Sequence, residues 1–142
     1  MESDQLKSQQ EVLLFSDTEQ SGHAMHYSVE ENWLHSEYKG FVTKQNLIVG
    51  ANNAIEWLNR TKCPNLLVNH LAIRGTWPDT TDWRMNIWVP KAIEAGLKKY
   101  AHVACAGSYS VMVAEHFYSR LNNQFEMMIF SDLAEAKAWL IS

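Results

Sequence analysis

The spacing of apolar residues changes near residue 43, and this change constrains the fold more than any other feature of the sequence. Before it, the segments 24–29 and 33–41 alternate between apolar and polar residues, a pattern typical of half-buried β-strands. After it, apolar residues between Leu47 and Leu58 recur at helical spacing, which is typical of a helix with one buried face. The chain is therefore predicted to begin with strands and to continue with a helix.

The rest of the chain alternates between short apolar runs and helical spacing. The runs at 66–68, 101–106 and 125–130 are predicted to be buried strands. A helix interrupted or restarted at Pro90 precedes the second run, and further helices follow the second and third runs. With a first strand near 12–15, this order predicts an α/β fold with a mixed sheet. Its N-terminal strands are antiparallel, its central strands are parallel, and helices pack against it.

Local signals mark where several elements begin and where loops lie. Thr43 is the expected N-cap of the first helix, because its hydroxyl can accept a bond from an unpaired backbone N–H. Ser131 or Asp132 is expected to cap the last helix. The segments 16–23 and 74–82 are rich in turn-forming residues and are predicted to be loops.

Length, charge and cysteine content define the general class of protein. The chain has 142 residues, which suits a single domain at 11–142 after a polar, disordered tail at 1–10. Its net charge of −4 argues against unaided nucleic-acid binding. No apolar run is long enough to cross a membrane, and the N-terminus lacks a signal-peptide pattern. Two cysteines outside any CxxC pair suit a reducing compartment, so we expect a cytoplasmic protein.

Several motifs, taken in their order and spacing, resemble a known group of proteins. They lie at residues 33, 37–43, 66–69, 88–92, 95–98, 101–103 and 130–140. Over roughly residues 24–140 the chain resembles the small bacterial STAS/SEC14-like proteins, a mostly uncharacterised group common in Bacteroidetes. The resemblance implies the fold of the sporulation anti-anti-sigma factors and of the CRAL-TRIO lipid-transfer domains.

The chain departs from that group at one functional position. Anti-anti-sigma factors carry a phosphorylated Ser at the start of the helix after a central strand. The corresponding stretch here, placed at residues 69–75, contains no Ser, and Thr76 is displaced. Many relatives have Asp where this chain has Asn69. The resemblance therefore implies the fold without the phospho-switch.

A ligand is expected beyond the carboxyl ends of the central strands, where open α/β sheets tend to bind small molecules. The candidate residues are Asn69, His70, Arg74, Trp77, Trp88 and Ser108. Aromatic walls with few polar groups suit a small amphipathic or apolar ligand. The alternative is that the tryptophans simply cover the core beneath a long connection, because Trp often sits partly exposed over a core.

Three kinds of chemical site receive little support from the sequence. His23 and His26 have the spacing of some zinc ligands but lack further ligands nearby, so we expect no metal and no cofactor. Cys105 lies in an apolar run and is expected to be buried and inert. A hydrolase would use His70 with Ser108, but no GxSxG elbow is present, so no catalytic residue is assigned.

Three functions remain open at this point. The first is a non-enzymatic regulatory or small-ligand-binding module, favoured by the resemblance and by the absence of a convergent catalytic set. The second is a homodimeric interaction domain that uses the exposed aromatic residues Trp33, Trp77 and Trp83. The third is the hydrolase with His70 and Ser108.

Overall fold

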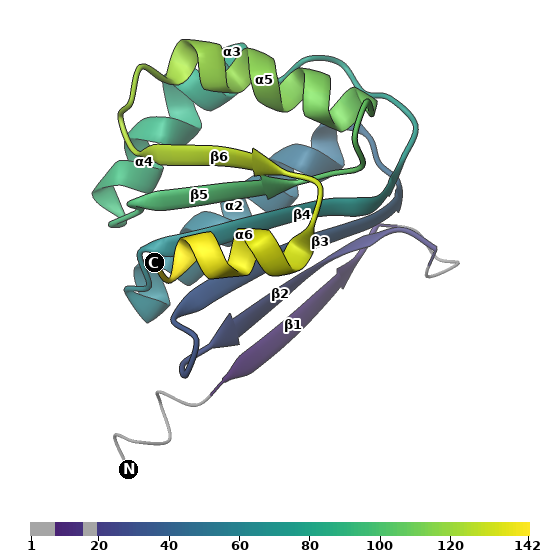
Figure 1. Ribbon diagram of the computed structural model, residues 1–142. Helices are drawn as coiled ribbons and strands as arrows, with labels where there is room; N and C mark the ends of the chain where they lie inside the picture. Colours follow the sequence, from purple (N-terminus) through teal and green to yellow (C-terminus); the bar gives the residue numbers. More distant parts are fainter. Residues whose placement is uncertain (1–7, 16–19) are drawn as a thin grey trace.

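The computed structural model describes residues 8–15 and 20–142 and shows one mixed sheet (Figure 1). Its strands lie side by side in chain order: β1 (Gln9–Leu14), β2 (Gly22–Ser28), β3 (Trp33–Phe41), β4 (Asn65–Arg74), β5 (Lys99–Val103) and β6 (Glu126–Phe130). Strands β1 to β3 pair antiparallel, whereas β3 to β6 pair parallel. The predicted mixed α/β fold is thereby confirmed.

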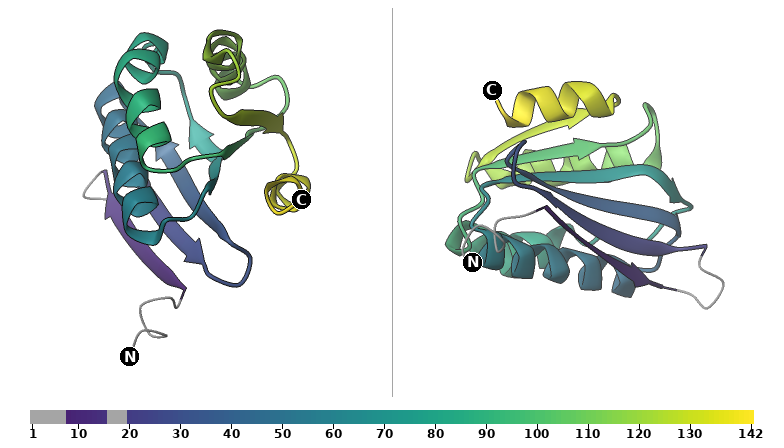
Figure 2. Two further views of the ribbon diagram at one scale, coloured as in Figure 1. Left: turned by 90° about the vertical axis from the view of Figure 1, so that its left-hand side faces the viewer. Right: turned by 90° about the horizontal axis from the view of Figure 1, so that it is seen from below.

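Helices cover the two faces of the sheet unequally. They are α2 (Lys44–Thr61), α3 (Thr81–Trp83), the π-helical turn η1 (Arg84–Trp88), α4 (Val89–Glu94), α5 (Tyr109–Leu121) and α6 (Leu133–Leu140). Helices α2 to α5 enclose the larger core on one face. Helix α6 packs on the opposite face over β4, β5 and β6 (Figure 2). In the described chain, that second face has no helix over β1 and β2.

Side-chain caps set the start of the two most clearly predicted helices. The hydroxyl of Thr43 accepts a bond from the N–H of Asn46 at 3.1 Å, and Oδ1 of Asn46 accepts the N–H of Thr43 at 3.0 Å. This reciprocal pair is a capping box, and it confirms Thr43 as the N-cap of α2. Of the two candidates for α6, Asp132 is the cap, since its Oδ1 accepts the N–H of Ala134 at 2.8 Å.

The helix around Pro90 is continuous rather than interrupted. It runs from α3 through η1 into α4, and the N–H of Val89 bonds to the carbonyl of Arg84, five residues back. In a regular α-helix a proline ring clashes with the carbonyl four residues before it. The wider turn placed directly before Pro90 gives the ring room, so the chain keeps its helical course.

Four predicted boundaries differ from the structure. Strand β4 spans ten residues rather than three, because its second half continues to pair with β3 as far as Arg74. Strand β5 ends at Val103 rather than at residue 106. At the N-terminus, Gln9 and Gln10 pair in β1, so they do not belong to the expected tail, and β2 begins at Gly22 inside the expected loop.

The expectations for residues 1–7 and 16–19 lie outside the described residues. Among the helices that the structure describes, none combines the length and apolar character needed to cross a bilayer.

Candidate functional site

A buried cluster of two histidines and one serine lies between the sheet and α5. His70 on β4 and His102 on β5 point to the same face, with their ring centroids 4.6 Å apart. Ser110 in the first turn of α5 lies between them. Its Oγ is 2.7 Å from Nδ1 of His70 and 2.8 Å from Nε2 of His102. One hydroxyl therefore connects both rings, donating to one nitrogen and accepting from the other.

The walls of this cluster are aromatic, with one cation. Tyr38 and Trp77 meet the ring of His70 edge to face, at 5.0 and 5.9 Å between centroids. The guanidinium of Arg84 donates to Oη of Tyr100 at 3.2 Å and to Oγ1 of Thr80 at 3.3 Å. The enclosed cavity has a volume of about 10 Å³, which is room for a single water molecule.

Burial keeps the imidazoles of this cluster neutral. Desolvation, together with the neighbouring His102 and Arg84, holds the pKa of His70 well below its usual value. Desolvation and then Arg84 lower the pKa of His102 to about 3. Nε2 of His70 is buried without a hydrogen-bond partner in the structure and faces this enclosed space.

The described residues of this cluster do not provide the oriented base and the substrate access that nucleophilic catalysis by a serine requires. A serine nucleophile requires a base that a third group orients, together with access for a substrate. Here both imidazoles share one hydroxyl, none of the described carboxylates is bonded to either ring, and His70, His102 and Ser110 are each at most 4% exposed. The cluster therefore joins β4, β5 and α5 internally.

The residues predicted to form one site are divided between several places. Asn69 and His70 lie within β4 rather than at its end, and they point to opposite faces of the sheet. Nδ2 of Asn69 donates to Nε2 of His35 at 3.1 Å. Oγ of Ser108 accepts the N–H of Val111 as the N-cap of α5. The hydrolase alternative required His70 to pair with Ser108, but His70 is bonded to Ser110 instead.

The two predicted tryptophans are mostly core residues. Trp77 and Trp88 are 5% and 2% exposed. The indole N–H of Trp88 donates to the carbonyl of Ala51 at 2.8 Å, and its ring packs against Tyr100 and Phe125. Trp88 thus joins η1 to α2, and the alternative interpretation of a tryptophan that covers the core describes its place.

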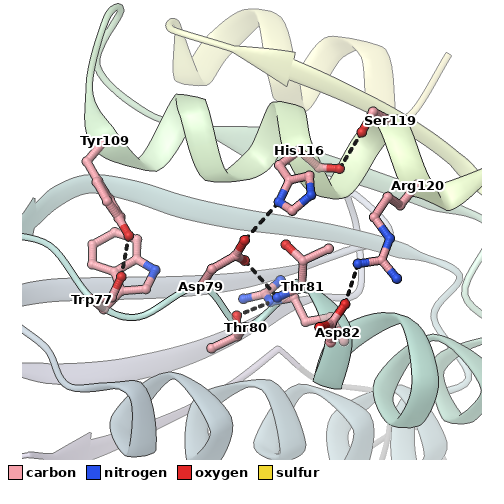
Figure 3. A network of polar contacts seen from close by, with 10 residues as sticks. Trp77, Asp79, Thr80, Thr81, Asp82, Tyr109, His116, Ser119 and Arg120 are labelled. Carbon is pink, nitrogen blue, oxygen red and sulfur yellow. Dashed lines mark hydrogen bonds and ion pairs between the residues drawn. The ribbon is translucent and has the colours of Figure 1, made fainter.

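A set of polar contacts, which we call the clasp, fastens the segment after β4 to α5 (Figure 3). The clasp pairs are Tyr109 with the carbonyl of Trp77, His116 with Asp79, and Arg120 with Asp82. Nδ1 of His116 lies 2.8 Å from Oδ2 of Asp79. The clasp holds this segment over the buried cluster.

The helix that follows β4 begins later than the resemblance indicated. It starts at Thr81 after Thr80 rather than within residues 69–75. Both threonines are at most 2% exposed, and Oγ1 of Thr80 accepts a bond from Arg84. A phosphate donor has no access to either hydroxyl in this conformation.

An open groove lies at the carboxyl ends of β3 and β4. Its volume is about 630 Å³. The described residues that line it are Gln20, Ser21, Lys39, Gly40, Phe41, Ala72 and Arg74. Parallel pairing joins Lys39 to Ala72 and Phe41 to Arg74, so two cations and one aromatic ring meet here. Of the predicted site residues, Arg74 alone lines this groove.

Sequence reasoning missed Lys39 and Phe41. The signal available was an apolar residue, Phe41, flanking Gly40 at the end of a strand, and Phe41 proves to be 70% exposed. Gly40 has a positive φ of 76°, and a Cβ built there would lie 2.0 Å from the carbonyl oxygen of Gln20. Only glycine fits this junction, which fixes the floor of the groove.

The remaining candidate residues belong neither to the buried histidine–serine cluster nor to the groove. His23 is buried against Ser36, whereas His26 lies on the opposite face of β2 near Glu37. Within the described ranges no group of three or more metal-binding side chains occurs. Cys105 follows the end of β5 and is exposed, so the expectation of a buried strand cysteine is wrong.

Comparison with known proteins supports the fold and adds no function. No family model matches the chain, and no curated protein matches it. A solved structure is similar: an uncharacterised protein of the DUF3478 family with a SpoIIAA-like fold, from Shewanella loihica PV-4. The two chains are 14% identical, with a TM-score of 0.50 over 94% of this chain and 93% of that one. The likeness shows a shared SpoIIAA-like fold, and the SEC14-like part of the resemblance stays a prediction.

Proposed function

We propose that this chain is a non-enzymatic regulatory module that binds a small ligand or a protein partner at the groove lined by Lys39, Phe41 and Arg74. The proposal rests on the contrast between the buried cluster and the open groove. The polar cluster that contains a serine and two histidines is enclosed around a cavity of about 10 Å³, whereas the groove of about 630 Å³ is open to solvent. Its volume falls within the range of small-molecule sites. It also lies at the carboxyl ends of parallel strands, where α/β folds bind ligands.

The site favours a ligand held at the surface rather than one enclosed in the core. An acyl chain does not fit the cavity beneath Trp77, which Tyr100, Phe117 and the histidines fill. The groove instead offers two charged groups beside one aromatic ring. Amphipathic molecules with a negative charge match it better than purely apolar ones.

A ligand screen on matched variants tests the proposal. Thermal shifts and native mass spectra would be recorded with a panel of metabolites, lipids and peptides. The double variant Lys39→Gln, Arg74→Gln would be compared with Lys62→Gln, which changes an exposed cation outside the groove. We expect stabilisation that the double variant loses and the control retains. The absence of any shift or adduct would contradict the ligand version of the proposal.

An activity assay tests the non-enzymatic part separately. Purified protein would be mixed with activated esters, with Ser110→Ala as the comparison. We expect no turnover above that of the variant. Turnover that disappears in Ser110→Ala but persists in the groove variant would show that the buried cluster opens and is catalytic.

Strand β1 favours a second copy of the chain as the alternative partner. Among the described strands it pairs with β2 alone, so no described strand covers its outer edge, and an open edge can pair with another strand. Val12, Leu13 and Leu14 on this strand are each more than a third exposed. The aromatic residues first considered for a dimer do not form one surface, because Trp77 is buried and Trp33 packs beneath Lys137. A monomeric mass in solution at tens of micromolar would contradict this alternative.

A further inference from the structure

The described residues of the groove at the ends of β3 and β4 have a net charge opposite to that of the molecule. The chain has a net charge of −4, yet the described lining of the groove contains Lys39 and Arg74 and no carboxylate. Other large surface grooves differ. The groove beside β1 and α2 is lined by Glu11 and Glu56 without a cation. Against the acidic background, a positive groove selects a negatively charged partner and speeds its approach.

An apolar contact accompanies these charges. Phe41 is 70% exposed at the rim, and its ring lies against the backbone of Gly75. A Cβ built on Gly75 would come within 3.0 Å of Cδ1 of Phe41. The missing side chain at Gly75 therefore allows the ring to lie close to the end of β4. Exposed aromatic rings of this kind are frequent anchors in protein interfaces.

Backbone contacts fix the floor of the groove and the relative positions of Phe41 and Arg74. Its floor is the junction of Gly40 with Gln20 and Ser21, where the backbone segments lie too close for any side chain at residue 40. The parallel ladder between β3 and β4 fixes Phe41 opposite Arg74. A site that is already ordered loses less conformational entropy when a partner binds.

Size and charge distinguish between classes of anion. A single small anion would fill only a small part of about 630 Å³ and would leave Phe41 without a contact. A nucleic acid extends well beyond the groove and would meet the rest of a molecule whose net charge is −4, which disfavours its binding. A short acidic segment of a protein fills the groove, places a carboxylate near each cation and supplies an apolar side chain for Phe41.

On the basis of the proposed function, we infer that the groove binds an acidic segment of a partner protein in which an aromatic or aliphatic residue is flanked by Asp or Glu. Lys39 and Arg74 contact the carboxylates, and Phe41 contacts the apolar side chain.

Fluorescence anisotropy with synthetic peptides tests this inference. The probe is a labelled peptide with one Phe between Asp and Glu residues, compared with versions that carry Asn and Gln, or Lys, in place of the acids. We expect the acidic peptide to bind about tenfold or more tightly than the amide version, because two charge contacts are lost. Raising the salt from about 0.05 M to about 0.3 M should weaken its binding.

Charge reversal separates a lost contact from a misfolded protein. In Lys39→Gln, Arg74→Gln we expect about a tenfold or greater loss of affinity for the acidic peptide, whereas the control Lys62→Gln, Lys91→Gln binds as the wild type does. In Lys39→Glu, Arg74→Glu the preference should switch to the Lys peptide, a gain that damage to the fold cannot produce. Equal affinity for the acidic and amide peptides, or unchanged binding by the double variant, would overturn the inference.

The same assay distinguishes failure of the inference from failure of the proposed function. A single-stranded oligonucleotide that binds more tightly than the acidic peptide, through Lys39 and Arg74, would replace the protein partner with a nucleic acid. If another molecule of the ligand panel binds at the groove but the acidic peptide does not, the inference fails and the proposed function stands. If neither binds, both fail.

Discussion

Ser110 connects two buried imidazoles with one hydroxyl, so the position of its side chain is tightly constrained. Its Oγ lies within 2.8 Å of nitrogens on His70 and His102, which belong to neighbouring parallel strands. A buried polar atom that loses its partner costs the full free energy of its desolvation. The geometry of three elements therefore depends on one side chain.

Replacing Ser110 by Ala should destabilise the protein by about 2–4 kcal/mol, because it leaves two imidazole nitrogens unpaired in the core. Urea unfolding at neutral pH measures the difference. Ser119→Ala is the matched control on the same helix, since its hydroxyl is exposed and bonds to the carbonyl of His116. We expect the control to change stability by less than about 0.5 kcal/mol. A similar small change in Ser110→Ala would show that the cluster is not stabilised by this hydroxyl.

The segment between β4 and β5 combines a π-helical turn with an attachment at the surface. The turn η1 accommodates Pro90 inside a continuous helix, and Arg84 at its start reaches toward the buried cluster. The clasp ties the same segment to α5 through contacts that are largely exposed. Exposed ion pairs contribute little to global stability. The clasp therefore governs local opening of this segment more than folding of the whole domain.

The double variant Asp79→Asn, Asp82→Asn tests the role of the clasp. We expect hydrogen exchange in residues 75–88 to accelerate about fivefold or more, while the free energy of unfolding falls by less than about 1.5 kcal/mol. Glu115→Gln, an exposed carboxylate on α5 outside the clasp, should leave both unchanged. Unaltered exchange in residues 75–88 would show that packing alone holds the segment.

Neutral histidines extend across the molecule, one on each of four adjacent strands. Burial, reinforced by His26, lowers the pKa of His23 and that of His35 to about 4. The pKa of His102 is lowered to about 3, and the pKa of His70 lies well below its usual value, in both cases chiefly because of burial. In each case the folded state binds a proton less readily than the unfolded state. The contribution of these neutral histidines to the free energy of unfolding is therefore fully present above about pH 6.5, and it is lost as the pH decreases toward 4.

Urea unfolding between about pH 7.5 and 5 measures this dependence. As the pH is lowered over that range, each of the four histidines should decrease the free energy of unfolding by roughly 2 kcal/mol, because only the unfolded chain gains the proton. Most carboxylates keep their charge above pH 5, so the effect in this range belongs to histidine. The variant His35→Gln should show a pH dependence smaller by about one proton. Constant stability across the range would show that the imidazoles take up protons in the folded state as readily as in the unfolded chain, which would contradict the lowered pKa values.

Local patterns in the sequence determined the order and type of the elements. The change of apolar spacing near residue 43, the capping of α2 by Thr43 and the alternation of strands and helices all depend on residues close together in the chain. Such signals act within a few residues, so they are readable without knowledge of the fold. The mixed sheet follows from them, whereas the SpoIIAA-like architecture was implied by the family resemblance and is supported by the similar solved structure.

Tertiary structure alone decided which side chains meet. The choice between Ser108 and Ser110 depends on the rotation of α5 against the sheet, which turns Ser110 inward and leaves Ser108 as a cap. Lys39 and Arg74 come together because β4 continues beside β3 for its full length, a pairing made by backbone hydrogen bonds that no local spacing records. Contacts between distant segments depend on strand pairing and helix packing, and for that reason the groove was visible only in the fold.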